Sequence, residues 1–325
     1  MLTINEFSAI LNNRVLIIDG AVGSLVKCLD SGEDIFADTR LVTKSGDTCT
    51  ICDLLNVYNP GIVTNFHKSY ITAGAEIIST NTFNSNSVSL NDAGVLLSPG
   101  FIYDLNRMGA ESALNSTKQS SGTVYVAGSV GPTSREALEI FTYSKQVRSV
   151  TPIALRQAFI EQIEGLIDGG VDILLLETFY NLINLKAALH AANDVMCQKH
   201  KTIPIVVSLA LADKSNRIPS GQTLSEVVAA IREFDNIVCI GLNCCSYNIG
   251  LLPALRELKH SSQYPVCLYP AVGIPDASGI YGESPDTFSA NLIEVIKEEP
   301  VSILGGCCGT TPKHIAILKS RLHGV

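Results

Sequence analysis

The chain has 325 residues, of which 46% are hydrophobic and 17% charged, enough apolar side chain for a large buried core. Its net charge of -8 argues against nucleic acid or an anionic membrane surface as a partner. No apolar run approaches the ~20 residues of a membrane span, and the N-terminus has no signal-peptide core. Ten cysteines without an export signal therefore indicate free or metal-bound thiols in a reducing cytoplasm.

Eight short β-branched runs alternate with segments of helical spacing along the chain. Because these runs are apolar on both faces and separated by helices, they predict parallel strands covered by helices. Eight such units predict a (β/α)8 TIM barrel that forms a single domain over residues 1–325. Periodicity alone also allows a doubly wound open sheet. The expected strands are residues 15–19, 75–82, 123–129, 171–177, 203–209, 237–243, 265–270 and 301–305. The expected helices include residues 60–73, 153–167, 182–192, 224–234, 250–258 and 286–297, and residues 30–50 are expected to form a long loop above the barrel.

Polar and thiol side chains stand at the ends of several expected strands. In a (β/α)8 barrel the C-terminal ends of the strands form one mouth, where functional groups gather. We therefore expect groups that lie far apart in the sequence to face a single site. These groups are Asp19, Asn81, Glu177, Cys244 and the adjacent pair Cys307 and Cys308.

The strongest chemical signal comes from three cysteines. Cys307 and Cys308 lie among glycines, in a tight turn between an apolar strand and a helix. Glycine lets the backbone take left-handed or cramped conformations, so that adjacent side chains can converge on one point. With Cys244, which ends another strand, they offer three thiolates and one open position, the ligand set of a reactive zinc site. Such a zinc ion can bind a substrate thiol and lower its pKa, which prepares the sulfur for alkylation.

The other cysteines are interpreted differently. Cys245 could replace Cys244 as a ligand, but we expect it to be a bystander. Cys49 and Cys52 form a C-x-x-C spacing that would suit redox or metal chemistry, but no second pair accompanies them. Small buried cysteines are common in protein cores. We expect structural roles for Cys28, Cys197, Cys239 and Cys267.

Two acidic residues, Asp19 and Glu177, end very apolar strands. Buried acids are rare unless they are paired or hydrogen-bonded. Two of them at one mouth would suit a substrate ammonium group, and the backbone amides of the glycine-bearing first loop could take a carboxylate. Together these features describe an amino acid held by its head while its thiol reaches zinc. Helix capping or barrel-end hydrogen bonding is the alternative role for each acid.

Several stretches match a known family. They are residues 18–24, 73–85, 128–133, 177–178, 220–223, 241–244 and 305–312. On these residues the sequence resembles the homocysteine S-methyltransferases, and most closely the homocysteine-binding module of cobalamin-dependent methionine synthase. The resemblance implies a (β/α)8 barrel, zinc on the three cysteines, homocysteine as methyl acceptor, and Asp19 and Glu177 as residues that help hold the amino-acid head. The residues that we place in the substrate site are Asp19, Gly20, Ala21, Asn81, Glu177 and Asn243.

The sequence departs from the family pattern at several positions. Ala21 and Ser24 stand where the first loop usually carries a second glycine and a threonine, and Ala21 adds a methyl group close to the expected substrate carboxylate. Tyr247 and Asn248 replace a common Gly-Pro, and Ala271 replaces an expected asparagine. These changes affect the acceptor and donor assignments more than the zinc assignment.

We therefore expect a zinc-dependent methyltransferase that converts homocysteine to methionine. The expected donor is a methylated corrinoid, either methylcobalamin or a corrinoid protein, with a sulfonium compound or a betaine as other options. Because the sequence stops at Val325 without a folate or cobalamin domain, the donor would diffuse in or come from a separate cobalamin or folate subunit. The alternatives are a non-catalytic subunit that binds homocysteine or a corrinoid protein, and a thiol-redox protein.

Overall fold

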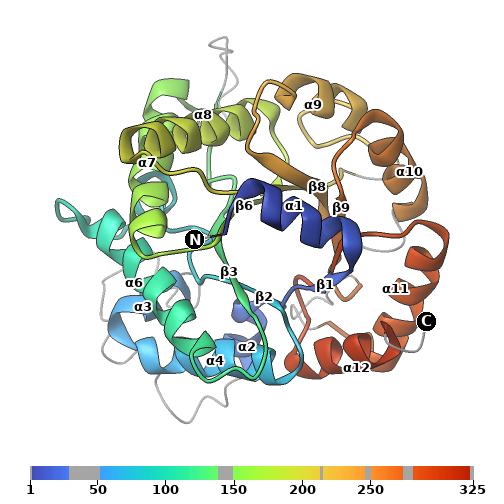
Figure 1. The fold of residues 1–325 in the computed structure, drawn as a ribbon. Coiled ribbons are helices and arrows are strands. Elements are labelled where there is room, and N and C mark those ends of the chain that lie inside the picture. The colour runs from blue at the N-terminus through green and yellow to red at the C-terminus, as the bar shows by residue number, and fades with distance from the viewer. Residues whose placement is uncertain are drawn as a thin grey trace.

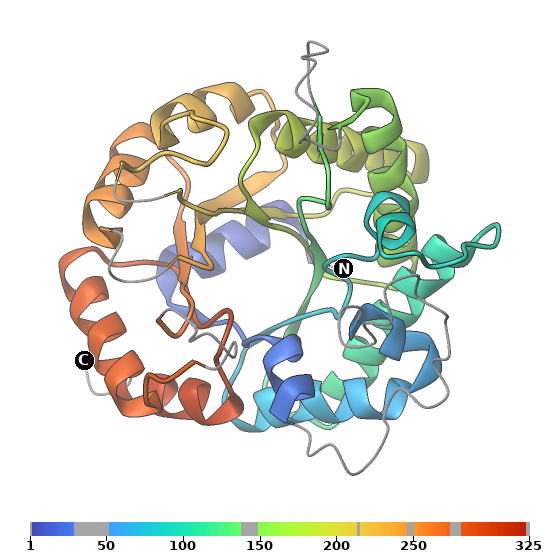
Figure 2. The same cartoon turned by 180° about the vertical axis from the view of Figure 1, so that it is seen from behind.

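The protein is described by a computed structural model that covers residues 2–28, 52–137, 149–212, 215–245, 250–273 and 281–322. Eight parallel strands curve into a barrel with helices around the outside, as Figure 1 and Figure 2 show from opposite ends. The strand order is β1-β10-β9-β8-β7-β6-β3-β2, and a bridge between Ile18 and Ile77 joins the two edge strands. The expected (β/α)8 barrel is confirmed, and the open sheet is excluded.

Each of the eight barrel strands overlaps one of the eight expected runs, and the run 237–243 forms a strand with the same bounds, whereas β3 and β6 extend past the expected ends to Val130 and Phe179. An additional parallel pair, β4 and β5, lies outside the barrel and was not expected. The expected loop over residues 30–50 lies outside the described residues. The strands are β1 Leu16–Ile17, β2 Ile77–Ser79, β3 Tyr125–Val130, β4 Glu136–Ala137, β5 Ser149–Val150, β6 Ile173–Phe179, β7 Ile205–Leu209, β8 Ile237–Asn243, β9 Val266–Tyr269 and β10 Ile303–Leu304.

Several helices begin at a residue whose side chain caps the first turn. Thr151, Asn181, Thr223 and Ser284 each accept a hydrogen bond from a backbone N–H of the first turn that follows. None of the helices in the described ranges combines the length and apolar character that a bilayer crossing needs. The helices are α1 Ile4–Asn13, α2 Val22–Cys28, α3 Leu55–Tyr58, α4 Pro60–Thr72, α5 Ser87–Asp92, α6 Phe101–Thr117, α7 Pro152–Asp168, α8 Leu182–Lys199, α9 Leu224–Ile231, α10 Leu251–Ser261, α11 Pro285–Glu298 and α12 Pro312–Leu322, and a short 3-10 helix covers Cys52–Leu54.

Helix α1 lies across the N-terminal end of the barrel (Figure 1). Its Phe7 and Leu11 are buried and pack with Leu16 and Val238 of the barrel interior. The opposite end, seen in Figure 2, is where the strands finish and the functional candidates stand. The first helix therefore covers one end of the barrel, and the candidate site lies at the other end.

The interior of the barrel changes from apolar to polar along the strand direction. Aliphatic side chains of four strands line a small cavity, and the residue two positions later on each strand is polar. Because side chains repeat every second residue along a strand, both sets face the same side of the sheet. The aliphatic residues are Ile77, Ala127, Leu175 and Val206. The polar residues, named here the polar layer, are Ser79, Ser129, Glu177 and Ser208.

We predict that Gly241→Ala strongly destabilises the fold. A Cβ atom at this inward position of β8 would lie 1.9 Å from the carbonyl oxygen of Cys267 and 2.5 Å from its Sγ. Overpacking of this kind costs about 1–3 kcal/mol or more. Urea unfolding should show that loss, whereas Gly122→Ala should change stability by no more than ~0.5 kcal/mol, because nothing lies within 4 Å of its added Cβ. Equal midpoints for both variants would contradict the described packing of β8 against β9.

Candidate functional site

Three cysteine sulfurs meet at the mouth of the barrel. The Sγ of Cys244, which follows β8, lies 2.9 Å from the Sγ of Cys307 and 3.2 Å from the Sγ of Cys308. All three sulfurs lie within 4.8 Å of one another, the one such group of Cys, His, Asp or Glu ligand atoms among the described residues. The structure thus brings together the three cysteines that the sequence nominated, in an arrangement that could hold a metal ion.

The backbone takes unusual conformations to make this cluster. Cys244 has φ 55°, in the left-handed region, which turns its side chain back toward the end of β10. On the other side, Gly309 has φ 82° directly after the pair of cysteines. A Cβ atom on Gly306 would lie 2.2 Å from a side-chain carbon of Thr310, so this turn can close only with a bare backbone.

The three thiols share their protons. Hydrogen bonds from Cys244 and Cys307 lower the pKa of Cys308 to about 3, although burial opposes this shift, and a hydrogen bond from Tyr281 adds to it. Hydrogen bonding to Cys244 and Cys308, together with burial, raises the pKa of Cys307. Hydrogen bonding to Cys307 lowers the pKa of Cys244, but bonding to Cys308 and burial raise it more. One thiolate therefore forms easily, and further ionisation needs a cation to offset the negative charge.

The two nominated acids lie beside this cluster, Asp19 buried and Glu177 half-buried. The side chain of Asp19, only 1% exposed, accepts hydrogen bonds from the backbone N–H of Ser79 at 2.9 Å and from its hydroxyl at 2.7 Å. Burial raises the pKa of Asp19 to about 8 against those bonds, and the charge of Glu177 adds to the rise. Burial also raises the pKa of Glu177 to about 7, although the hydroxyl of Ser129 donates to this carboxyl. No described Lys, Arg or His offsets either acid.

The amide side chain of Asn243 connects the residue next to Glu177 with the thiols. Its Oδ1 accepts from the backbone N–H of Thr178 at 2.9 Å and from the hydroxyl of Ser208 at 2.8 Å. Its Nδ2 donates to the hydroxyl of Thr178 at 2.7 Å and to the Sγ of Cys307 at 3.7 Å. Thr178 has φ 61°, a strained conformation for a β-branched residue, and these bonds hold it. Asn243 therefore fixes the turn that follows Glu177 together with one of the thiols.

The first loop is joined to the cysteine turn. The backbone N–H of Ala21 points to the hydroxyl of Thr310 at 3.4 Å, and a Cβ atom on Gly20 would lie 2.3 Å from that same oxygen. The hydroxyl of the buried Tyr70, from α4, lies 3.2 Å from the carbonyl oxygen of Ala21 and 3.1 Å from that of Thr310. Gly20 and Ala21 thus stand against the turn that carries the metal-binding candidates.

Asn81 is placed differently from the other candidates. Its side chain is 7% exposed and donates to the carbonyl oxygen of Cys52 at 2.8 Å, while the side chain of Asn56 donates to the carbonyl oxygen of Asn81 at 2.7 Å. These bonds point away from the cluster, toward the segment at the start of α3. Asn81 therefore fixes the rim of the barrel in this structure.

The cysteines interpreted as bystanders stay away from the cluster. The Sγ of Cys245 is buried and donates to the carbonyl oxygen of Asn243 at 3.0 Å, and burial raises the pKa of its thiol to about 12. Cys239 and Cys267 are buried inside the barrel, and Cys197 is exposed on α8. The C-x-x-C interpretation cannot be judged, because Cys49 lies outside the described residues.

Sequence reasoning missed several residues that complete the site. Ser129 and Ser208, two members of the polar layer, bond to Glu177 and Asn243. Tyr281 bonds to Cys308, and Tyr269 of β9 lies next to Glu177. The two serines carry a usable signal, because each follows the last inward aliphatic residue of its strand by two positions. Tyr281 lies outside any strand and gives no such signal.

The fold and the site define a class: a (β/α)8 barrel enzyme that gathers three thiols at the C-terminal ends of its strands. Comparison with known families then identifies the group within this class. Residues 16–322 match the homocysteine S-methyltransferase family, so the chain belongs to that family and is an enzyme of that type.

Solved structures support the fold. The homocysteine methyltransferase MmuM from Escherichia coli, in its metallated form, shares 22% sequence identity with the chain at a TM-score of 0.72. The match covers 96% of this chain and 98% of that one. The apo form of the same protein matches with a TM-score of 0.68 at 22% identity, over 96% of this chain and 97% of that one.

We predict that Asp19 makes the substrate-free protein less stable as the pH rises. The pKa of Asp19 is raised to about 8 in the folded state, so its contribution is fully present below the unfolded value of ~4 and is lost as the pH rises through about 8. Between pH 5 and 8 the melting temperature of the wild type should fall by at least ~4 °C more than that of Asp19→Asn. The exposed Asp286→Asn variant should track the wild type, and parallel curves for wild type and Asp19→Asn would refute the assignment.

Proposed function

We propose that this enzyme transfers a methyl group to the thiol of homocysteine, forming methionine, with a zinc ion held by Cys244, Cys307 and Cys308. The observation that carries the proposal is the cluster of three sulfurs at the same end of the barrel as the buried carboxyl group of Asp19 and the half-buried one of Glu177. Membership of the homocysteine S-methyltransferase family supports homocysteine as the methyl acceptor.

The three thiols suit zinc. Thiolate sulfur is a soft ligand that favours zinc over magnesium or calcium. In a tetrahedral site with Zn–S bonds of ~2.3 Å, the sulfurs lie about 3.8 Å apart. The observed separations of 2.9 and 3.2 Å would have to open by about 0.6 to 0.9 Å, within reach of small side-chain rotations once the shared protons leave. When bound, zinc would supply a site for the substrate thiol and lower its pKa.

Asp19 and Glu177 are proposed to hold the ammonium group of the amino acid. Burial keeps the pKa of each carboxyl high, so without a ligand both tend to stay protonated near neutral pH. An ammonium group between them would supply the missing positive charge and favour the ionised forms. Ser79 and Ser129 keep the two carboxyl groups oriented for that contact.

The carboxylate of the amino acid is proposed to bind at the backbone of Gly20 and Ala21. The long bond of 3.4 Å from Ala21 to Thr310 leaves this N–H free to turn to a stronger acceptor. The methyl group of Ala21 would lie near the carboxylate and limit its pose. Asn81 and Asn243 are proposed to serve the substrate through the groups that they hold in place.

The donor is proposed to be a methylated corrinoid, either free methylcobalamin or a methylated corrinoid protein or cobalamin subunit that docks at the mouth. The support is the resemblance of the sequence to the homocysteine-binding module of cobalamin-dependent methionine synthase. We further propose that residues 1–325 form a single domain that works in the cytoplasm. Eight described cysteines are free, which suits a reducing compartment.

We predict that the purified protein holds about one zinc ion per chain and that Cys308→Ser loses both the metal and the turnover. Cys245→Ala is the matched control, since it changes a neighbouring thiol that points away from the cluster. Metal analysis by mass spectrometry and methionine formation should agree for each variant. A zinc-free Cys308→Ser protein with normal turnover would refute the metal assignment.

We predict that methylcobalamin supports methionine formation. Zinc-loaded protein should be incubated without oxygen with homocysteine and, separately, methylcobalamin, S-methylmethionine, S-adenosylmethionine, glycine betaine or methyltetrahydrofolate, and methionine should be measured by mass. Turnover with S-methylmethionine or betaine but not with methylcobalamin would refute the corrinoid donor and keep homocysteine methylation. Tight homocysteine binding without turnover on any donor, even with candidate corrinoid proteins added, would favour a non-catalytic subunit.

A further inference from the structure

We infer that the hydroxyl group of Tyr269 contacts the ammonium group of the bound amino acid, as a third acceptor beside Asp19 and Glu177. This inference rests on the proposed function, because it assigns a role within the proposed substrate site. It starts from the hydroxyl oxygen of Tyr269, which is buried and has no hydrogen-bond partner among the described residues.

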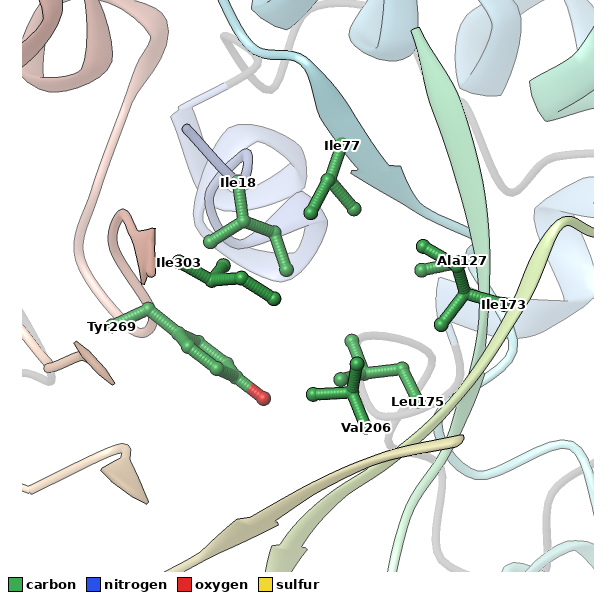
Figure 3. Close-up of a pocket in the computed structure, with 8 residues that line it drawn as sticks. All are labelled: Ile18, Ile77, Ala127, Ile173, Leu175, Val206, Tyr269 and Ile303. Carbon is green, nitrogen blue, oxygen red and sulfur yellow. The ribbon is translucent and has the colours of Figure 1, made fainter. Parts of the chain in front are cut away.

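Tyr269 is the last residue of β9, and its side chain is 3% exposed. Figure 3 shows its ring reaching into the barrel, with the hydroxyl pointing toward Val206 and Leu175 on the opposite wall. No described group forms a hydrogen bond of good geometry with this hydroxyl. An unpaired buried hydroxyl costs about 1–3 kcal/mol, so a protein retains one at an active site for a reason.

The space below the ring cannot satisfy the hydroxyl. The cavity holds about one water-sized sphere. Apart from Tyr269 itself, its walls are aliphatic, formed by Ile18, Ile77, Ala127, Ile173, Leu175, Val206 and Ile303. A buried water needs two to four polar partners, and here it would find one. The missing partner must therefore come from the mouth of the barrel.

The groups nearest to the hydroxyl on that side belong to the polar layer. Hydrogen-bonding influence from Tyr269 lowers the pKa of Glu177, and Ser208 acts in the same way on the pKa of Tyr269, but neither neighbour meets the distance and angle of a formed hydrogen bond. The proton of Ser208 already goes to Asn243, and the proton of Ser129 goes to Glu177. Among the polar layer and Tyr269, all of them described residues, the hydroxyl of Tyr269 is the one without a hydrogen-bond partner.

A buried ammonium group has three N–H donors and needs three acceptors. Asp19 and Glu177 supply two, and each keeps lone pairs free beyond its serine partner. A hydroxyl is one donor and two acceptors, so Tyr269 can accept the third N–H while its own proton goes to Glu177. The unpaired hydroxyl of Tyr269 thus matches the one N–H of the ammonium group that the two acids leave without an acceptor.

The test compares two ligands and two variants. Affinities of zinc-loaded protein for homocysteine and for 4-mercaptobutanoate, which lacks only the amino group, would be measured by calorimetry without oxygen. The variants are Tyr269→Phe, which removes the hydroxyl, and Tyr125→Phe as a control. Tyr125 packs edge-on against Phe7 at the covered end of the barrel, away from the site.

We expect Tyr269→Phe to weaken homocysteine binding about ten-fold or more and to change 4-mercaptobutanoate binding less than about two-fold. Without ligand, the variant should be at least as stable as the wild type, because it loses an unpaired buried group. Tyr125→Phe should leave both affinities unchanged. The thiol contribution is common to both ligands and cancels in this comparison.

Three results would overturn the inference. Homocysteine could bind Tyr269→Phe as tightly as the wild type, or both ligands could lose affinity equally. Alternatively, the variant could be less stable by the amount of a lost hydrogen bond, which would show that the hydroxyl has a protein partner. If the wild type binds homocysteine no better than 4-mercaptobutanoate, the proposed amino-acid site itself fails, and the role of Tyr269 falls with it.

Discussion

The mouth of the barrel depends on the hydrogen bonds of one side-chain amide, that of Asn243. Two donors and two acceptors of this amide are in use, and they connect β6, β7 and the cysteine turn. The left-handed conformation of Thr178 is costly in isolation and persists because the surrounding bonds determine it. Since Asn243 joins one thiol to the residue next to Glu177, the distance between the thiols and this acid is fixed before any ligand arrives.

The apolar interior below the polar layer shapes the electrostatics above it. Aliphatic side chains and the dry cavity give the acids a surrounding that disfavours charge, and the raised pKa values of Asp19 and Glu177 follow from it. The same surrounding strengthens any interaction with a ligand cation. The free protein thus loses stability at these two acids, and the amino acid of the proposed complex would restore it on binding.

Much of the fold and part of the candidate site can be predicted from local sequence patterns. The bounds of β8 follow from an apolar run that ends in Asn-Cys, and the meeting of Cys244 with Cys307 follows from the rule that barrel strands end at one mouth. The direction of the Asn81 side chain could not be predicted, because it depends on the segment at Cys52, which has no periodic signal. Nor could the reach of Tyr269 across the barrel, which depends on the register of β8 and β9 and on the empty space opposite. Contacts between distant strands are set by tilt and register, and a single sequence does not report these.

Helix α1 covers one end of the barrel and leaves the end at which the strands finish for the substrates of the proposed reaction. Phe7 and Leu11 close the far end, so both substrates of the proposed reaction and both products share a single passage. In the proposed complex the amino-acid head would lie at the level of Glu177, and a bulky methyl carrier would sit above it. The proposed reaction would then be sequential: the amino acid would enter before the carrier docks, and methionine would leave only after the spent carrier withdraws. That order of binding would follow from the ten-residue helix Ile4–Asn13, which covers the end of the barrel away from the proposed site.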